Sequence, residues 1–257
     1  MDKQPTSLET SDTQTNEVLR EWRESASYWQ KHVGTIRAMF GPVTQALIDE
    51  ASIVKGHSVL DVAGGSGEPS LTIAETVGPI GSVTCTDAVA EMVAAAQSEA
   101  QRRGLTNVQF RQCAADSLPF ESESFDVVVS RLGVMFFPDP PAALREMLRV
   151  TKRGGALSLA VWDKSELNPF SYLITNVVSH YFDVTPAGPN VPGAFRFAQP
   201  GALARILKDA GATDVKERVL KFHIVAPISP KGFWAMRSET SGTLGKKVTL
   251  PVLITTA

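Results

Sequence analysis

Along the middle of the chain, short apolar runs alternate with segments whose apolar residues recur at helical spacing. The apolar runs, each predicted to be a strand, are Ser58–Ala63, SVTCT at 82–86, NVQFRQC at 107–113, FDVVVS at 125–130 and ALSLAVW at 156–162. The helical segments are Pro69–Val77, Val89–Arg103, Pro141–Val150 and Gly201–Ala210. Strands that alternate with helices, several of them apolar throughout, are typical of a parallel sheet covered by helices on both faces. The pattern predicts an α/β protein.

Both ends of this α/β region carry additions. Residues 1–17 are polar and predict a disordered leader, whereas 18–257 are expected to form a single domain. Within it, residues 18–56 predict two N-terminal cap helices, because Leu19, Trp22, Ala26, Trp29 and Val33 fall on one helical face. Later strands are expected at 213–225 and, as an edge strand because of Pro251, at 248–257.

Residues 163–200 do not follow the α/β pattern. They hold five prolines together with six aromatic residues, which a polar linker would not need. We interpret this segment as a lid insertion that lines a substrate pocket and, together with the N-terminal helices, closes it. The alternative is that the same aromatics form the contact between two copies in a homodimer.

A glycine-rich turn follows the first strand in the sequence VLDVAGGSGEPSL. Glycines let the backbone turn sharply and approach a ligand, and the helix that follows offers unpaired amides. The order is not Gly-x-Gly-x-x-Gly, and no Lys-Ser/Thr follows, which excludes a triphosphate P-loop. Asp87 lies at the end of the next strand, which favours a carboxylate that accepts hydrogen bonds from the hydroxyls of a ribose. An aspartate at this position can also cap the following helix.

Four ordered motifs together resemble the class I S-adenosylmethionine-dependent methyltransferases, and most closely the ubiquinone/menaquinone-biosynthesis C-methyltransferase group. They are VLDVAGGSGEPSL, TDAVAEM, AADSLPFESESFDVVVSRLGVMFF and ALREMLRVTKRGGALSLAVWD. The resemblance implies a Rossmann-like fold with a mostly parallel seven-stranded sheet, and S-adenosylmethionine as cofactor. It also implies the cofactor-binding residues, which are Asp61, Ala63, Gly65, Ser66, Gly67, Asp87, Ala88, Met92, Ala115, Asp116, Ser117, Ser130 and Arg131.

Methyl transfer needs little catalytic machinery beyond an acceptor held in line, exclusion of water and at most one base. His32, His180 and Arg131 are the candidate catalytic residues. The aromatic side chains expected to bind the acceptor are Tyr28, Trp29, Tyr172 and Phe195. They indicate a small, largely apolar or aromatic molecule methylated at carbon, oxygen or nitrogen. The four histidines are scattered, so no metal site is expected.

Composition limits the classes of binding partner and the cellular compartment that we expect for this protein. The chain has 25 Lys and Arg against 27 Asp and Glu, so no overall basic charge recruits nucleic acid. No apolar run reaches the roughly 18 residues that span a membrane. Two cysteines and a polar N-terminus without an apolar signal core predict a cytoplasmic protein.

Other functions compete with methyl transfer to a small molecule. An enzyme of the same fold and cofactor can catalyse a cyclisation or rearrangement without transferring the methyl group, and the motifs do not distinguish the two. An NAD-dependent dehydrogenase is disfavoured by the Ala-Gly-Gly-Ser-Gly order. A nucleic-acid methyltransferase is disfavoured because Ser130-Arg131-Leu132-Gly133 stands where an Asn/Asp-Pro-Pro-Tyr/Phe motif would be.

Overall fold

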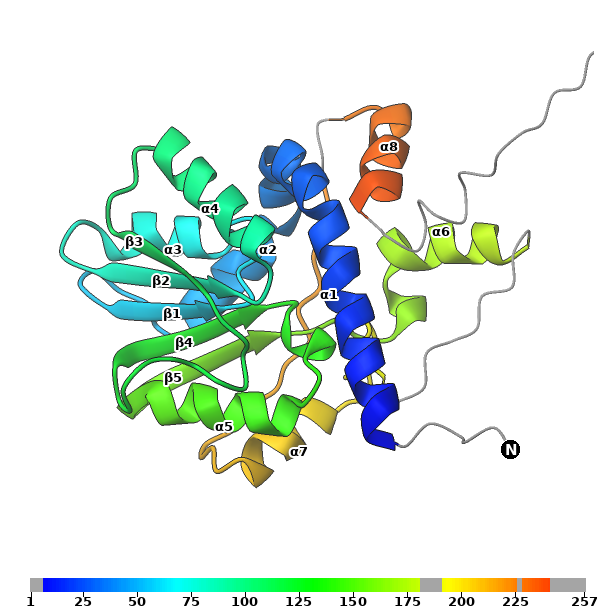
Figure 1. Ribbon diagram of the computed structural model, residues 1–257. Coiled ribbons are helices and arrows are strands. Elements are labelled where there is room, and N and C mark those ends of the chain that lie inside the picture. The colour runs from blue at the N-terminus through cyan, green and yellow to red at the C-terminus, as the bar shows by residue number, and fades with distance from the viewer. Residues whose placement is uncertain (1–6, 181–190, 226–227, 241–257) are drawn as a thin grey trace, which may run out of the picture.

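A computed structural model describes residues 7–180, 191–225 and 228–240. Within them, five parallel strands form one sheet in the order β3-β2-β1-β4-β5 (Figure 1). Their bounds are β1 Ser58–Val62, β2 Ser82–Asp87, β3 Val108–Gln112, β4 Phe125–Arg131 and β5 Thr151–Ala160. The predicted α/β architecture is therefore confirmed, with five described strands where seven were expected.

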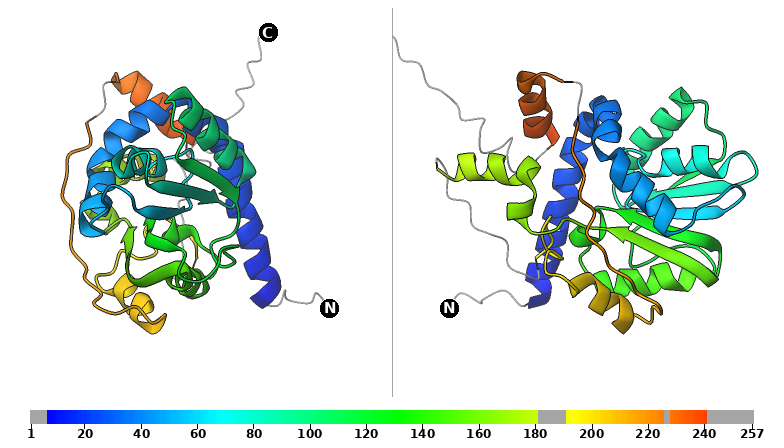
Figure 2. Two further views of the ribbon diagram at one scale, coloured as in Figure 1. Left: turned by 90° about the vertical axis from the view of Figure 1, so that its left-hand side faces the viewer. Right: turned by 180° about the vertical axis from the view of Figure 1, so that it is seen from behind.

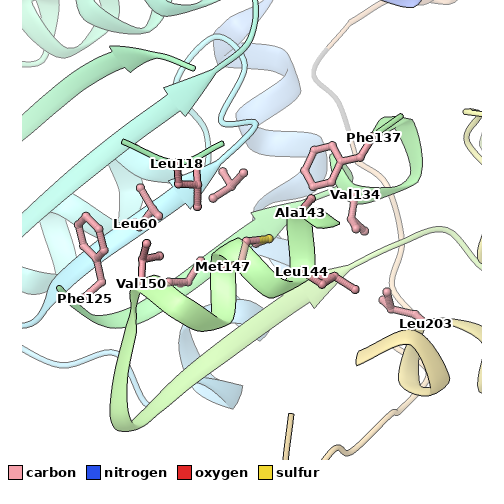
Figure 3. Close-up of a cluster of buried hydrophobic side chains, with 12 residues drawn as sticks. Leu60, Leu118, Phe125, Val134, Phe137, Ala143, Leu144, Met147, Val150 and Leu203 are labelled. Atoms are coloured by element: carbon pink, nitrogen blue, oxygen red, sulfur yellow. The ribbon is translucent and has the colours of Figure 1, made fainter. Parts of the chain in front are cut away.

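Helices cover both faces of this sheet. The helical bounds are α1 Ser7–Lys31, α2 Val33–Glu50, α3 Ser70–Val77, α4 Ala90–Arg102, η1 Val134–Phe136, α5 Pro140–Val150, η2 Ser165–Leu167, α6 Pro169–Ser179, α7 Ala202–Asp209 and α8 Pro230–Thr240. Alternate residues of each strand face opposite layers. Leu60 of β1 belongs to one buried cluster with Met147 of α5 and Leu203 of α7 (Figure 3), whereas its neighbour Val59 belongs to a second cluster with Ile48 of α2 and Ile73 of α3.

Two predictions about the chain's additions need correction. The first helix begins at Ser7, inside the segment expected to be a disordered leader, and only residues 1–6 of that leader lie outside the described residues. Residues 213–225 are not a strand but an extended stretch between α7 and α8 (Figure 2). The expected last strand at 248–257 lies outside the described residues, as does 181–190 of the lid insertion.

Side-chain contacts instead of strand pairing hold the extended stretch in place. Phe222 and Ile224 pack against an apolar cluster near α2, while Val219 and Val225 point to solvent. Glu217 accepts a hydrogen bond from the Gly201 amide at 2.8 Å. The alternation of apolar residues in 213–225 therefore indicates only that one side of the segment is buried. It does not require that a neighbouring strand pairs with it.

The carboxyl ends of the strands meet the N-terminal helix. α1 stands across the strand tips, and α6 and α8 lie beyond it on the side away from the sheet (Figure 1). Within the described ranges, no helix is long and apolar enough to cross a membrane.

Candidate functional site

The turn between β1 and α3 folds back tightly against the neighbouring strand. The Gly64 amide donates to the Thr86 carbonyl at 2.9 Å. A Cβ at Gly64 would lie 2.6 Å from the Cys85 Sγ, so only glycine fits there. At Gly65, by contrast, φ is +56° and the place of a Cβ is open space. The turn is therefore closed against β2 on one side and leaves its backbone open to a ligand on the other.

Asp61, near the end of β1, is a buried carboxylate with one oxygen unpartnered. Its Oδ2 accepts hydrogen bonds from the Ser70 amide at 3.1 Å and the Ser70 hydroxyl at 2.5 Å. Its Oδ1 is buried and has no hydrogen-bond partner among the described residues. Burial raises the pKa of Asp61 to about 7, and the hydroxyl of Ser70 and the charge of Arg131 act in the opposite direction. A cationic donor at Oδ1 would favour the ionised carboxylate.

The end of β4, which pairs with β1, brings Ser130 and Arg131 to the same edge. The Ser130 hydroxyl is buried without a described partner. The Arg131 guanidinium donates to Thr44 Oγ1 at 2.8 Å and lies 5.9 Å from the ring centre of Phe40, both on α2. Burial lowers the pKa of Arg131. Adjacent strand ends therefore present a carboxylate, a hydroxyl and a cation with unused hydrogen-bonding capacity.

Asp87, at the end of β2, ties the glycine turn to the start of α4. Its Oδ2 accepts from the Gly65 amide at 3.0 Å and its Oδ1 from the Val89 amide at 2.9 Å. Burial raises the pKa of Asp87, and these hydrogen bonds partly offset that effect. Each carboxylate oxygen has a second lone pair, so these backbone contacts leave Asp87 able to accept from a ligand as well. Both interpretations of Asp87 remain compatible with this geometry.

The remaining expected cofactor residues surround Asp87. Met92 is buried in the first turn of α4, beside Val89. The Cys113 amide donates to the Asp87 carbonyl at 3.0 Å, which holds the segment after β3 against the end of β2. In that segment Ala115 is partly buried, whereas Asp116 and Ser117 are exposed. The fold therefore brings the residues expected around the cofactor to one edge of the sheet.

Aromatic side chains of α1 pack over the edge of the sheet where the strands end. Trp22 lies edge-on to Phe136 of η1, with ring centres 5.2 Å apart, and 5.6 Å from Trp29. Ala26 of the same helix is buried against Met92. Of the two aromatic residues expected to bind the acceptor here, Trp29 is partly buried and Tyr28 is 40% exposed. α1 therefore forms a cover over the strand tips.

The two candidate histidines differ in their surroundings. His32 is mostly buried between α1 and α2, and its Nε2 lies 2.6 Å from Glu239 Oε2 on α8. Glu239 also accepts from Lys31 Nζ at 2.8 Å. His180 is exposed just after α6, and its Nδ1 lies 2.7 Å from the Asn176 carbonyl. His32 is therefore held by a carboxylate, and His180 contacts its own helix.

The described parts of residues 163–200, the segment interpreted as a lid, contact η1 and α2. After the undescribed residues, the Gly193 amide donates to the Met135 carbonyl of η1 at 3.1 Å, which places Phe195 in a segment next to the tip of β4. Before them, Phe170 of α6 packs edge-on against Phe40 with ring centres 5.9 Å apart. Tyr172 is 38% exposed on α6.

Several residues at this edge had no signal in the sequence. Phe40 and Thr44 lie on α2 and contact Arg131, and Glu239 lies far along the chain from His32. We call the aromatic residues that gather between α2, α6 and α8 the aromatic cluster. Its members are Phe40, Trp162, Phe170 and Phe233. Their positions depend on contacts between elements distant in sequence, so local patterns do not reveal them.

Comparison with known proteins places residues 53–210 within a family model described as a methyltransferase domain. An uncharacterised protein of Mycobacterium tuberculosis is 40% identical over 127 residues, covering 49% of this chain and 44% of the relative. The ubiquinone/menaquinone biosynthesis C-methyltransferase UbiE of Pasteurella multocida is 37% identical over 125 residues, covering 48% and 47%. The chain thus spans about half the length of these curated relatives.

Among solved structures, the [4+2]-cyclase SpnF resembles this chain with a TM-score of 0.51 and 26% identity. The alignment covers 66% of this chain and 55% of SpnF.

Proposed function

The chain belongs to the class I S-adenosylmethionine-dependent methyltransferases, and we propose on this basis that it methylates a small, largely apolar or aromatic acceptor. The observation that carries the proposal is the buried, unpartnered Oδ1 of Asp61, located where an open glycine turn meets a buried arginine. A ligand with an ammonium and a carboxylate group matches this pair of charges.

The donor set fits S-adenosylmethionine as a whole. Asp61 would accept from the ammonium group and Arg131 would hold the carboxylate, while the glycine turn at Ala63, Gly65, Ser66 and Gly67 would lie against the amino-acid end of the cofactor. Asp87 would accept from the ribose hydroxyls with its free lone pairs. Ala88 and Met92 would line the adenine, and Ala115, Asp116 and Ser117 would border its edge. Ser130, whose buried hydroxyl has no partner among the described residues, would supply a further hydrogen-bonding group to the cofactor or the acceptor.

When bound, S-adenosylmethionine supplies a methyl group that is already strongly electrophilic. The protein's part is to position an acceptor and exclude water. Trp22 and Ala26 of α1 cover the strand tips, and Phe136 closes against Trp22. This aromatic cover is a means of keeping water from the reacting atoms.

The acceptor site is proposed to lie between α1, the aromatic cluster and the lid insertion. Trp29 packs in the same apolar group as Phe40 and Phe170, so a flat molecule would meet aromatic surfaces on more than one side. Phe195 would approach from the lid segment that is bonded to η1. Tyr28 and Tyr172 are exposed and would contribute at the entrance.

His32 is the proposed base for acceptors that must lose a proton. Glu239 holds Nε2 and leaves Nδ1 to accept that proton. His180 contacts only its own helix among the described contacts, which makes it the weaker candidate.

The test is incubation with S-adenosylmethionine labelled in the methyl group and a panel of phenols, quinols and aromatic amines, followed by mass spectrometry. Labelled product supports methyl transfer. Cofactor binding in calorimetry with an acceptor that is isomerised without gaining label would favour the second candidate, a cyclisation or rearrangement. The similarity to SpnF is the observation that supports that second candidate.

A further inference from the structure

Arg237 on α8 is a cation placed among apolar side chains. Its guanidinium carbon lies 4.5 Å from the ring centre of Phe170, a member of the aromatic cluster. The preceding residue, Met236, is 2% exposed and packs with Met39 and Phe40. The Nε of Arg237 is buried and has no hydrogen-bond partner among the described residues. A strong donor is therefore directed into an apolar environment.

No carboxylate within the described ranges forms an ion pair with this arginine. Glu239, two residues further along α8, is bonded to Lys31 and His32 instead. Residues two apart on a helix do not face each other, so Glu239 cannot serve both sides. Burial lowers the pKa of Arg237, and no charge among the described residues acts in the opposite direction. Buried charges are normally paired, so a structural role alone leaves this one unexplained.

Aromatic contacts connect Arg237 to the proposed reaction site. Phe170 packs against Phe40 with ring centres 5.9 Å apart, and Phe40 in turn lies beneath Arg131. Trp29, whose Nε1 is also buried without a described partner, packs in the same apolar group. Two unsatisfied N–H donors thus belong to one aromatic environment, with Phe40 between Arg237 and the strand tips.

We propose that Arg237 binds a carboxylate carried by a flat aromatic acceptor, with Trp29 Nε1 as a second donor. This inference rests on the proposed function, because it specifies the chemistry of the same acceptor. A guanidinium matches a planar carboxylate through paired N–H groups, and the guanidinium carbon of Arg237 lies over the Phe170 ring, 4.5 Å from its centre. The aromatic frame of the acceptor would occupy the surface that the cluster offers.

The test measures binding of two probes of equal shape, 2-naphthoate and the neutral 2-naphthamide, by calorimetry. The wild-type protein is expected to bind the carboxylate about tenfold or more tightly than the amide, because a charge-assisted bond is lost in the amide. Arg237→Met should abolish that preference. Lys231→Met is the matched control, since it removes a positive charge from an exposed position of the same helix and should leave the preference intact.

The melting temperature of each variant is measured without ligand. Arg237→Met should melt at or above the wild-type temperature, because it removes a partly buried cation that has no ion pair among the described residues. If it fails to fold, Arg237→Lys decides, since it keeps the charge but not the paired donors and should reduce the preference several-fold. The proposal would be overturned if the wild-type protein bound the two probes equally or bound neither of them. It would also be overturned if Arg237→Met, or Arg237→Lys where that variant decides, kept the full preference for the carboxylate.

Calorimetry with S-adenosylmethionine on the same proteins separates this inference from the proposed function. Equal affinity of the wild-type protein for the two probes, with its cofactor binding intact, overturns only the role of Arg237. Failure of the wild-type protein to bind S-adenosylmethionine overturns the proposed function, whatever the naphthoate result.

Discussion

Asp61→Asn is expected to remove the part of the pH dependence of cofactor affinity that Asp61 contributes, without unfolding the protein. The asparagine carbonyl can still accept the hydrogen bonds that Asp61 Oδ2 receives from the Ser70 amide and hydroxyl. What disappears is the ionisable group that would meet the ammonium of S-adenosylmethionine. The variant therefore tests the charge at this position separately from the packing around it.

The magnitude follows from the raised pKa of Asp61. With a pKa of about 7, the ionised fraction rises about tenfold between pH 6 and pH 8. We consider the ratio of the wild-type affinity for S-adenosylmethionine to that of Asp61→Asn, measured at the same pH. This ratio should rise about tenfold from pH 6 to pH 8, and taking the ratio cancels the effect of the cofactor's own ionisation. At pH 8 the variant should bind about 1.5–3 kcal/mol more weakly, the worth of a hydrogen bond to a charged group.

The stability of the cofactor-free protein gives an independent check with the opposite sign. A carboxyl group whose pKa is higher in the folded state stabilises the fold at low pH, and this contribution is lost as pH rises through the folded pKa. The free energy of unfolding should fall by about 1.4 kcal/mol from pH 6 to pH 8 in the wild-type protein relative to Asp61→Asn. Urea titrations at the two pH values measure this difference.

Calorimetry at pH 6, 7 and 8 is the deciding assay. Equal affinity of the two proteins at pH 8 would refute the assignment of Asp61 to the ammonium group. A parallel pH dependence in both proteins would refute the argument that Asp61 titrates near neutrality.

Three further substitutions test other parts of the site. Asp87→Ala should weaken S-adenosylmethionine binding by about 2–3 kcal/mol in calorimetry and, because Asp87 also accepts from the Gly65 and Val89 amides, lower the free energy of unfolding by about 1 kcal/mol. Unchanged affinity would leave it with a structural role only. Phe195→Ala should raise the acceptor KM and spare cofactor affinity, whereas a changed sedimentation coefficient with unaltered kinetics would indicate a dimer contact instead. Glu239→Gln should lower kcat about tenfold or more with little change in KM for an acceptor that loses a proton, since Glu239 holds His32. Glu166→Gln, at an exposed position, is the control. If Glu239→Gln and the control had equal kcat values, His32 and Glu239 would have no part in the mechanism.

The sequence alone located the five described strands and the edge at which their carboxyl ends meet. Strands β1 to β5 and helices α3, α4, α5 and α7 lie within a few residues of their expected positions, apart from an earlier start of β5. These elements repeat a local pattern of apolar spacing, and the parallel order then brings the strand ends to one edge. The glycine turn, Asp61 and Asp87 meet there for the same reason.

The surroundings of the proposed acceptor site were decided by tertiary structure. The pairing of His32 with Glu239 joins residues 207 positions apart, and the position of Arg237 over Phe170 joins α8 to α6. The extended stretch 213–225 has the alternation of a strand, yet its buried side faces α2 and its apolar neighbours. Periodicity records which side of a segment is buried, because that depends on the segment's own geometry. It does not record which distant element covers that side, because that choice is made only when the whole chain packs.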